Sequence, residues 1–301
     1  MELRQLKSFV KTAETLNFSE AAKVLSITQS TLSQQIKQLE DEMNILLFQR
    51  NSHSVILTEA GKELYSLAKK TLHSVDSCFE RMQDLQKLLV GTLNVGATYT
   101  FSPILEETLI NFAKLYPKVK LHIYYKPMEE LMEMLKRHEI DFVLAFKSVK
   151  QYPEVESRVL FNNHLAAIVN KHHSLANKKT VSLSEIEKYD VVLPSQGLQA
   201  RNLFEQIKSR YCPHLNIRME LNEVYVLLNL VKKSQWVTFL SESTVYSEDY
   251  LRAIPLDVSE NEMEGCIHLL KDEYFKHSAQ EFIRLLSEST AVKRHMLNGL
   301  F

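Results

Sequence analysis

The feature that most constrains the fold is residues 19–40, SEAAKVLSITQSTLSQQIKQLE. It holds two short segments whose apolar residues recur at helical spacing, joined by a tight polar connection. The small residues Ala21 and Ala22 would let two helices approach closely at an open angle, as in a helix-turn-helix. We expect Ser19 and Thr28 to be the N-caps, because a hydroxyl there can accept a hydrogen bond from an unpaired backbone N–H.

The second of these helices would expose short hydroxyl and amide side chains. Gln can bond in two places to the edge of adenine, Ser and Thr can reach bases or phosphates, and Lys can neutralise a phosphate. An ordinary solvated helix face is the alternative, and polar residues alone do not decide between the two. The candidate DNA contacts of this segment are Thr28, Gln29, Ser30, Thr31, Ser33, Gln34 and Lys37.

A longer match surrounds this motif. Residues 3–48 read LRQLKSFVKTAETLNFSEAAKVLSITQSTLSQQIKQLEDEMNILLF, and residues 55–61 read VILTEAG. Over these residues the chain resembles the LysR-type transcriptional regulators of bacteria. The resemblance implies a winged helix-turn-helix, a dimerising linker helix and a two-lobed effector domain similar to periplasmic binding proteins. It also implies double-stranded operator DNA, a small-molecule effector and RNA polymerase as partners.

The chain is long enough for several domains, because 301 residues exceed one compact core of typical size. The expected fold class is α/β with an N-terminal all-α winged helix-turn-helix. We expect the DNA-binding domain at residues 1–58, the linker helix at 59–89 and the effector domain at 90–301. Lobe 1 would comprise about residues 90–160 and 265–301, and lobe 2 about residues 161–264.

Net charge does not identify the DNA partner. The whole chain has a formal net charge of −1, and its first 90 residues hold eleven basic and eleven acidic side chains. Binding must therefore depend on where the basic residues lie and on repeated copies of the domain. In the family the wing hairpin is commonly basic, whereas the tip here reads RNSHSVILT. Arg50 is its reliable cation, and His53 would add a minor contact at low pH.

Residues 59–88 contain no proline, and their apolar residues predict a long helix with a coiled-coil seam of about three to four heptads. A helix buried against its own domain is the alternative. We expect a homodimer through this helix and a homotetramer through the effector lobes, since two-fold symmetry suits a palindromic operator. The seam residues are Ala68, Leu72, Val75, Phe79, Met82 and Leu89.

After Gly91 the pattern changes to short strands alternating with helices, which predicts a parallel sheet with right-handed crossovers. In the loop ATYTFSP, Ser102 is expected to be an N-cap, with Pro103 as the first helical residue. A second lobe is expected to begin near Phe161, and the chain would then return to the first lobe through a helix at about residues 281–286.

The predicted effector site lies at the carboxyl ends of the parallel strands, beside helix N-termini. Hydroxyls and cations there would suit a small anion, most simply a carboxylate. For Ser102, ordinary helix capping is the alternative. The candidate effector-binding residues are Thr98, Thr100, Ser102, Lys147, Ser195, Gln196 and Arg201.

One segment departs from the family pattern. A glycine-rich GxGI run often precedes a late strand of the second lobe, whereas this chain reads LVKKSQWVTFL. We expect a different backbone there and a narrower cleft near residues 241–243.

Other classes of protein fit less well. The six glycines form no phosphate-binding or dinucleotide-binding motif, so we expect no cofactor, no metal and no catalytic residues. The adjacent His172 and His173 are expected to be solvated. No apolar run is long enough for a membrane span, and the N-terminus is no secretory signal, so we expect a cytoplasmic protein without membrane contact.

Two alternatives to an effector-binding regulator stay open. Peroxide-sensing members of the family use a cysteine pair in the second lobe, whereas Cys78, Cys212 and Cys266 lie far apart in this sequence. A redox sensor is nevertheless the stronger rival. The weaker one is an enzyme of binding-protein fold that carries a DNA-binding head.

Overall fold

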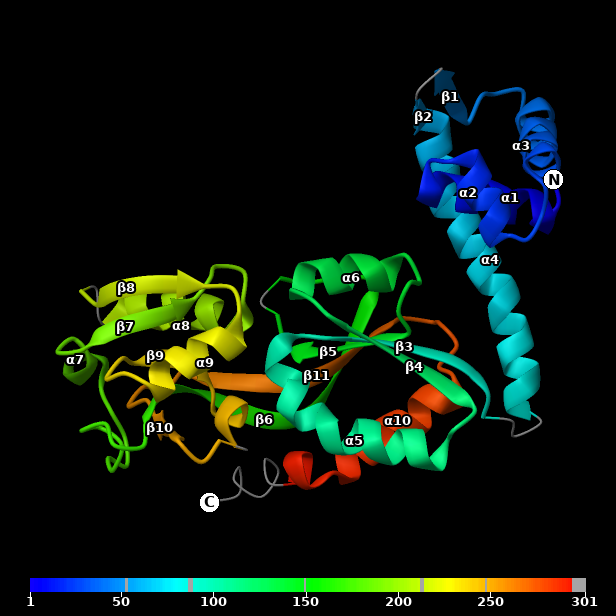
Figure 1. Ribbon diagram of the computed structural model, residues 1–301. Helices are drawn as coiled ribbons and strands as arrows, with labels where there is room; N and C mark the ends of the chain where they lie inside the picture. Colours follow the sequence, from blue (N-terminus) through cyan, green and yellow to red (C-terminus); the bar gives the residue numbers. More distant parts are fainter. Residues whose placement is uncertain (52–53, 86–88, 149, 212–213, 247, 294–301) are drawn as a thin grey trace. The chain divides into compact units, whose positions relative to one another are not determined.

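The computed structural model describes residues 1–51, 54–85, 89–148, 150–211, 214–246 and 248–293. The chain divides into two compact units, residues 1–88 and 89–301 (Figure 1). No helix among the described residues is both long enough and apolar enough to cross a membrane.

The first unit is a winged helix-turn-helix followed by a long helix. Its core is aromatic at the centre: the ring centroid of Phe48 lies 5.5 Å from that of Phe9 and 5.7 Å from that of Phe18. The hairpin β1–β2 forms the wing. The elements are α1 (Leu3–Thr15), α2 (Phe18–Val24), α3 (Gln29–Met43), β1 (Phe48–Asn51), β2 (Ser54–Leu57) and α4 (Glu59–Leu85).

One of the two expected helix caps in this unit is confirmed. Thr28 is the N-cap of α3, and its side chain accepts a hydrogen bond from the Thr31 N–H. Ser19 is not the N-cap of α2. Asn17 has that place, and its side chain accepts hydrogen bonds from the backbone N–H groups of Ser19 and Glu20. The helix therefore begins before Ser19, with the aromatic ring of Phe18 in its first turn buried in the core.

The linker helix was expected at residues 59–89, and α4 is described as Glu59–Leu85. Residues 86–88 lie outside the described part, and Leu89 is not helical. Its first half packs on its own domain: Ala68 is 1% exposed in the N-terminal core, and Leu72 packs against that core. The second half differs, because Phe79 is 68% and Met82 56% exposed within the chain. The alternative of a helix buried in its own domain thus holds for the first part of the seam only.

The second unit is built on a seven-stranded sheet with the strand order β10-β6-β11-β5-β3-β4, and β9 also pairs with β6. The expected parallel pairing is confirmed, because β3 pairs in parallel with both β4 and β5. The elements of the first lobe are β3 (Gly91–Ala97), η1 (Tyr99–Phe101), α5 (Ser102–Leu115), β4 (Val119–Tyr125), α6 (Met128–Lys136), β5 (Phe142–Phe146) and α10 (His277–Glu288).

The expected return of the chain to the first lobe is also confirmed. Helix α10 lies beside α5, with the Phe112 and Phe282 ring centroids 5.3 Å apart (Figure 1). Ser102 is not the N-cap of α5: Phe101, the last residue of the short 3-10 helix η1, has that place, and the Phe101 side chain makes no capping hydrogen bond. The 3-10 turn has already placed Ser102 in helical conformation, so its hydroxyl cannot act as an N-cap.

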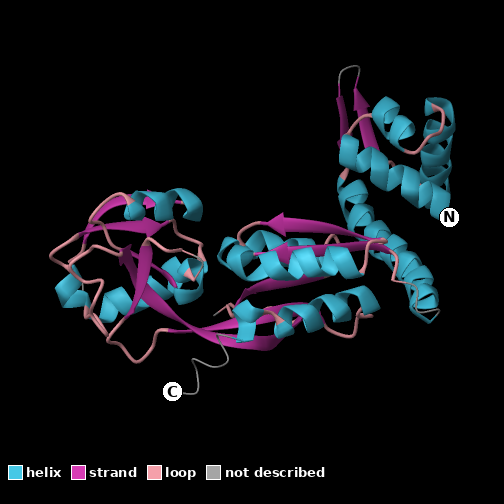
Figure 2. Cartoon of the chain, turned by 60° about the horizontal axis from the view of Figure 1, so that its bottom comes forward, coloured by secondary structure: helices cyan, strands magenta, loops and turns pink. Residues whose placement is uncertain are grey.

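Two long strands join the lobes. β6 (Val155–Asn170) and β11 (Glu262–Leu270) pair with each other and cross between the lobes (Figure 2). In the second lobe, β7 and β8 form a separate parallel pair. Its elements are α7 (Leu183–Ile186), β7 (Asp190–Pro194), α8 (Gln199–Tyr211), β8 (Asn216–Leu221), α9 (Val224–Lys232), β9 (Thr238–Ser241), η2 (Glu242–Val245) and β10 (Leu251–Pro255).

Candidate DNA-binding and effector-binding sites

Helix α3 turns one face inward and one face to solvent. Leu32, Ile36 and Leu39 are fully buried in the core of the first unit, which fixes the rotation of the helix. The remaining face therefore points outward. Thr28, Gln29, Ser30, Thr31, Gln34 and Lys37 are exposed, whereas Ser33 is half-buried.

Hydrogen bonds at the start of α3 order these side chains. The Thr28 hydroxyl oxygen lies 2.9 Å from that of Ser30 and 2.8 Å from that of Thr31. The Ser19 hydroxyl donates to the Gln29 side-chain oxygen at 3.1 Å, so α2 orients the amide of Gln29. A pre-ordered amide loses less side-chain entropy when it meets a base edge.

Glu40 has a role that sequence reasoning missed. It is only 6% exposed, and its carboxylate accepts hydrogen bonds from the backbone N–H groups of Leu47 at 2.8 Å and Phe48 at 3.2 Å. It therefore ties the end of α3 to the start of the wing. In the wing, Arg50 pairs with Val55 across the hairpin. The side chain of Arg50 and all of His53 lie outside the described residues.

The second unit has a cavity of about 690 Å³ between its two lobes. Lobe 1 contributes the first turn of α6 and the segment after β5. Lobe 2 contributes the start of α8, and the strand β11 closes one side. The lining residues are Met128, Glu129, Phe146, Lys147, Ser148, Lys150, Tyr152, Gly197, Gln199, Asn202, Leu203, Gln206, Glu262, Met263 and Glu264.

A much smaller cavity of about 20 Å³ lies beside it and includes Thr98 and Thr100 in its lining. The two threonine hydroxyl oxygens are 3.2 Å apart, and Thr98 is 6% exposed. Ser102 does not line either cavity within the described part of the unit. The two cavities share Met128, Gly197 and Gln199.

The Gln199 side chain bridges the lobes. Its oxygen accepts a hydrogen bond from the Phe146 backbone N–H at 3.0 Å, and its amide nitrogen donates to the Phe146 carbonyl oxygen. The same nitrogen lies 2.9 Å from the Met128 sulfur. Gln199 is the first residue of α8 in lobe 2, whereas Phe146 ends β5 in lobe 1. No signal in the sequence distinguishes this glutamine from others.

The cations of the large cavity are paired with carboxylates. The Lys147 ammonium contacts Glu264 at 2.5 Å, and this hydrogen bond raises the pKa of Lys147. The Lys150 ammonium lies 3.6 Å from Glu129. The expected place of Lys147 at the cleft agrees with the geometry. Its neutralisation by Glu264 was not expected.

Arg201 does not have the expected place. Its side chain is 4% exposed and forms ion pairs with Glu205 at 2.7 Å and Glu220 at 2.8 Å. It also donates to the Pro194 carbonyl at 2.9 Å. Burial opposes the charge, but the hydrogen bonds to both carboxylates outweigh it and raise the pKa of Arg201. Arg201 therefore holds α8 against β7 and β8, and it lines neither inter-lobe cavity in the part of the chain described.

Ser195 and Gln196 follow β7 as expected, but neither lines the two cavities formed by the described residues. The Ser195 backbone N–H donates to the Leu221 carbonyl at 2.8 Å, which continues the pairing of β7 with β8. Between Gln196 and Leu198, Gly197 has a φ of +89° and provides the turn into α8.

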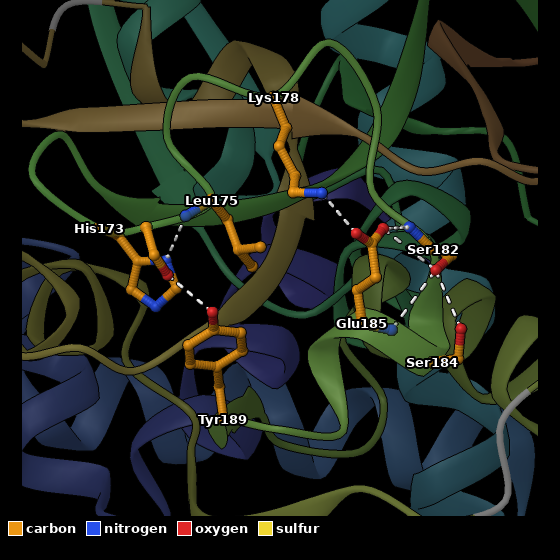
Figure 3. Close-up of polar contacts among 8 residues, drawn as sticks. His173, Leu175, Lys178, Ser182, Ser184, Glu185 and Tyr189 are labelled. Carbon is orange, nitrogen blue, oxygen red and sulfur yellow. Dashed lines mark hydrogen bonds and ion pairs between the residues drawn. The ribbon is translucent and has the colours of Figure 1, made fainter.

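The expectation that both histidines 172 and 173 are solvated is wrong for His173, which is 3% exposed. Its ring packs at a tilted angle against that of Tyr189, with the ring centroids 4.6 Å apart (Figure 3). Burial lowers the pKa of His173. Its Nδ1 accepts from the Leu175 N–H, and its Nε2 contacts the Gln235 carbonyl at 3.2 Å. Gln235 belongs to residues 230–240, the segment that lacks the family's glycines. The His173 side chain therefore helps to hold that segment.

Cys266 is fully buried, and burial, followed by the charge of Glu264, raises the pKa of its thiol to about 11. A thiolate is the form that reacts with peroxide, so this environment disfavours a redox role for Cys266. Cys78 is exposed on α4, and Cys212 lies outside the described residues.

Comparisons with known proteins agree with both halves of the chain. The family described as "Bacterial regulatory helix-turn-helix protein, lysR family" matches residues 3–62. The family described as "LysR substrate binding domain" matches residues 86–291.

Several relatives cover most of the chain. The transcriptional dual regulator GltC of Bacillus subtilis is 30% identical over 247 residues, which cover 81% of this chain and 82% of GltC. The uncharacterized HTH-type transcriptional regulator YnfL of Escherichia coli is 32% identical over 250 residues, covering 81% and 83% of the two chains.

Solved structures share the fold. A full-length OxyR of Pseudomonas aeruginosa has a TM-score of 0.75 at 23% identity, covering 97% of this chain and 95% of its own. Full-length CbnR in complex with its target DNA has a TM-score of 0.65 at 20% identity, and the match covers 98% of this chain and 100% of the CbnR chain. Together with the family matches, the helix-turn-helix and the two-lobed domain show that this chain is a DNA-binding transcriptional regulator of the LysR family with an effector-binding domain, and not an enzyme.

Proposed function

We propose that the exposed face of α3 reads operator bases in the major groove and that the wing contacts the adjacent backbone. The supporting observation is the arrangement of α3: its apolar stripe is buried, and hydroxyl, amide and ammonium groups cover the opposite face. In this assignment Gln29 and Gln34 contact bases, Lys37 contacts phosphate, and Thr28, Ser30, Thr31 and Ser33 contact bases or phosphates. Arg50 and His53 of the wing complete the set.

The active species in this proposal is a homodimer formed through the second half of α4, and two dimers form a tetramer through the effector units. The exposed Phe79 and Met82 support the dimer, because a single chain leaves large apolar side chains of this helix in water. A tetramer would place four copies of α3 on one bent operator with half-sites about one helical turn apart. It would act in the cytoplasm and contact RNA polymerase there.

The effector of this proposal is a small carboxylate that binds between the lobes of the second unit. The cavity of about 690 Å³ supports this, since its size is typical of small-molecule sites. Lys147 would attract the carboxylate, and Thr98 and Thr100 would supply hydroxyls once the small cavity opens. Arg201, Ser102, Ser195 and Gln196 are not part of the revised site, because other groups hold them or they lie off the cavities. Binding would favour one arrangement of the lobes and so change the DNA bend.

The test is footprinting of the purified full-length protein on its own upstream DNA, with and without a panel of small organic acids. We expect protection of an interrupted palindrome that contracts or shifts with one acid. Absence of any specific protection would refute the assignment of α3. Protection that no acid alters would leave DNA binding intact and refute the carboxylate effector.

A further inference from the structure

The end of β5 presents a pair of backbone groups that the sheet does not use. β3 pairs with β5 only as far as Ala97 opposite Leu144, and the Thr98 N–H then donates to the Leu144 carbonyl at 3.0 Å. After this the chain turns into η1, because the Thr98 carbonyl accepts from the Phe101 N–H at 2.9 Å. Phe146 is therefore left with an N–H and a C=O that no strand among the described residues satisfies on that side.

The Gln199 amide satisfies both groups at once. Its oxygen accepts from the Phe146 N–H and its nitrogen donates to the Phe146 carbonyl, as a neighbouring strand would. A buried backbone pair needs such a partner, since leaving a donor or acceptor unpaired costs about 1–3 kcal/mol. A ligand that displaces Gln199 must therefore bring an acceptor and a donor side by side. A plain carboxylate supplies the acceptor alone.

The charged side chains that line the large cavity also favour a ligand that carries both an acceptor and a donor. Lys147 and Lys150 are each paired with a carboxylate, Glu264 and Glu129. The third carboxylate of the lining, Glu262, forms no ion pair among the described residues. A ligand that is only an anion would have to separate a lysine from its glutamate. A ligand that also carries an ammonium group would instead find an excess of carboxylates.

We propose that the effector is an α-amino acid, with Gln199 holding the place of its head group in the unliganded protein. The amino acid carboxylate accepts from the Phe146 N–H, and its ammonium group donates to the Phe146 carbonyl in reach of the acidic lining. Gln199 lines both cavities, so its displacement would enlarge the space beside them. This inference rests on the proposed function of the inter-lobe cavity as the effector site.

The test measures binding by calorimetry to the full-length protein with matched pairs of ligands that differ only in the amino group. Suitable pairs are L-leucine with isocaproate, L-glutamate with glutarate, and L-phenylalanine with hydrocinnamate. We expect one amino acid to bind and its deaminated partner to bind at least about tenfold more weakly, the value of one lost hydrogen bond to a charged group. Gln199→Ala should raise the affinity for the amino acid about tenfold, because the ligand no longer competes with the glutamine.

Gln280→Ala is the matched control. Gln280 also donates to a phenylalanine carbonyl, that of Phe275 at 2.9 Å, but it is exposed on α10 away from the cavity. The Gln280→Ala variant should bind the amino acid with the same affinity as the unaltered protein. Hydrogen exchange adds a second measurement: the Phe146 amide should exchange faster in Gln199→Ala and slow again when the amino acid is added.

Three results would count against the proposal. If an acid and its amino acid bound equally well, the effector would not be an amino acid, and the cavity would still be a carboxylate site. Unchanged Phe146 exchange in Gln199→Ala would overturn the role of Gln199 while leaving the cavity as the effector site. Failure of every ligand to bind, to the unaltered protein and to Gln199→Ala alike, would overturn the proposed effector site itself.

Discussion

The ring of Phe161 on β6 covers Gly265 on β11 so closely that a Cβ at Gly265 would lie 2.4 Å from it. The two residues pair across the strands that join the lobes, and the register of those strands shifts between Gly265 and Cys266. Phe161 also packs against Phe101, with ring centroids 5.7 Å apart. The crossing point of the lobes is thus fixed by an aromatic ring that only glycine can accommodate.

Gly265→Ala should destabilise the second unit by about 1–3 kcal/mol, the usual cost of overpacking a core. Urea unfolding followed by the fluorescence of Trp236, the single tryptophan of the chain, would measure this. Phe161→Leu removes the ring, so the same alanine substitution should cost clearly less in that background. An equal cost in both backgrounds would show that the ring is not the cause.

Gln29→Ala and Lys37→Ala should weaken DNA binding in different ways. Loss of the Gln29 amide should lower affinity by about 1–3 kcal/mol for operator DNA with the preferred base, and hardly at all for random DNA. Loss of the Lys37 charge should weaken binding to all sequences and reduce the slope of log affinity against log salt by about one. Fluorescence anisotropy across a salt series measures both.

Lys118→Ala is the control for this experiment, since Lys118 is exposed in the second unit and should leave both quantities unchanged. If Gln29→Ala and Lys37→Ala behaved alike on operator and random DNA, α3 would not be reading bases as proposed.

Phe79→Asp should weaken the dimer about tenfold or more, because it removes a large apolar side chain from the proposed seam and adds a charge. Sedimentation of the purified protein over a range of concentrations would measure the dissociation constant. Ser74→Asp adds the same charge to an exposed position outside the seam, so it should have little effect. Equal weakening by both variants would point to a general charge effect instead of a seam.

His268 should make stability depend on pH in a defined window. It is 2% exposed, and burial lowers its pKa from 6.5 to about 4, so the folded protein holds the neutral ring. The unfolded chain takes up the proton first, so this contribution is fully present above pH 6.5 and is lost as the pH falls toward 4. The loss amounts to about 3 kcal/mol for a shift of this size.

Urea unfolding at several pH values within this window would measure the loss. His268→Gln keeps a hydrogen-bond donor near Ser157 and the Ala145 carbonyl but cannot titrate. Its unfolding free energy should depend less steeply on pH than that of the unaltered protein. A slope identical in both proteins would assign the effect to other groups, among them the buried His173.

Much of the fold follows from patterns within a few residues of sequence. The buried stripe Leu32, Ile36 and Leu39 repeats at helical spacing, so it predicts both α3 and the face that α3 turns outward. The alternation of short strands and helices after Gly91 likewise predicts a parallel sheet, which is confirmed. The cap at Thr28 is local for the same reason, since donor and acceptor lie three residues apart.

Local sequence patterns predicted the wrong N-cap in the two helices where more than one neighbouring residue was available for that position. Asn17 and Ser19 are both good N-caps, and the burial of Phe18 in the core decides for Asn17. Ser102 precedes a proline as an N-cap often does, but the 3-10 turn before it moves the cap to Phe101.

By itself the sequence determined the helix-turn-helix, the face of α3 that points outward and the strand-to-helix junctions beside the inter-lobe cavity. Only the tertiary structure decided which side chains at those junctions face the cavity. Glu220, which lies on a neighbouring strand, and Glu205 turn Arg201 away from it. Gln199 meets Phe146 across 53 residues of chain. Such contacts depend on partners that are distant in sequence, and no local spacing encodes them.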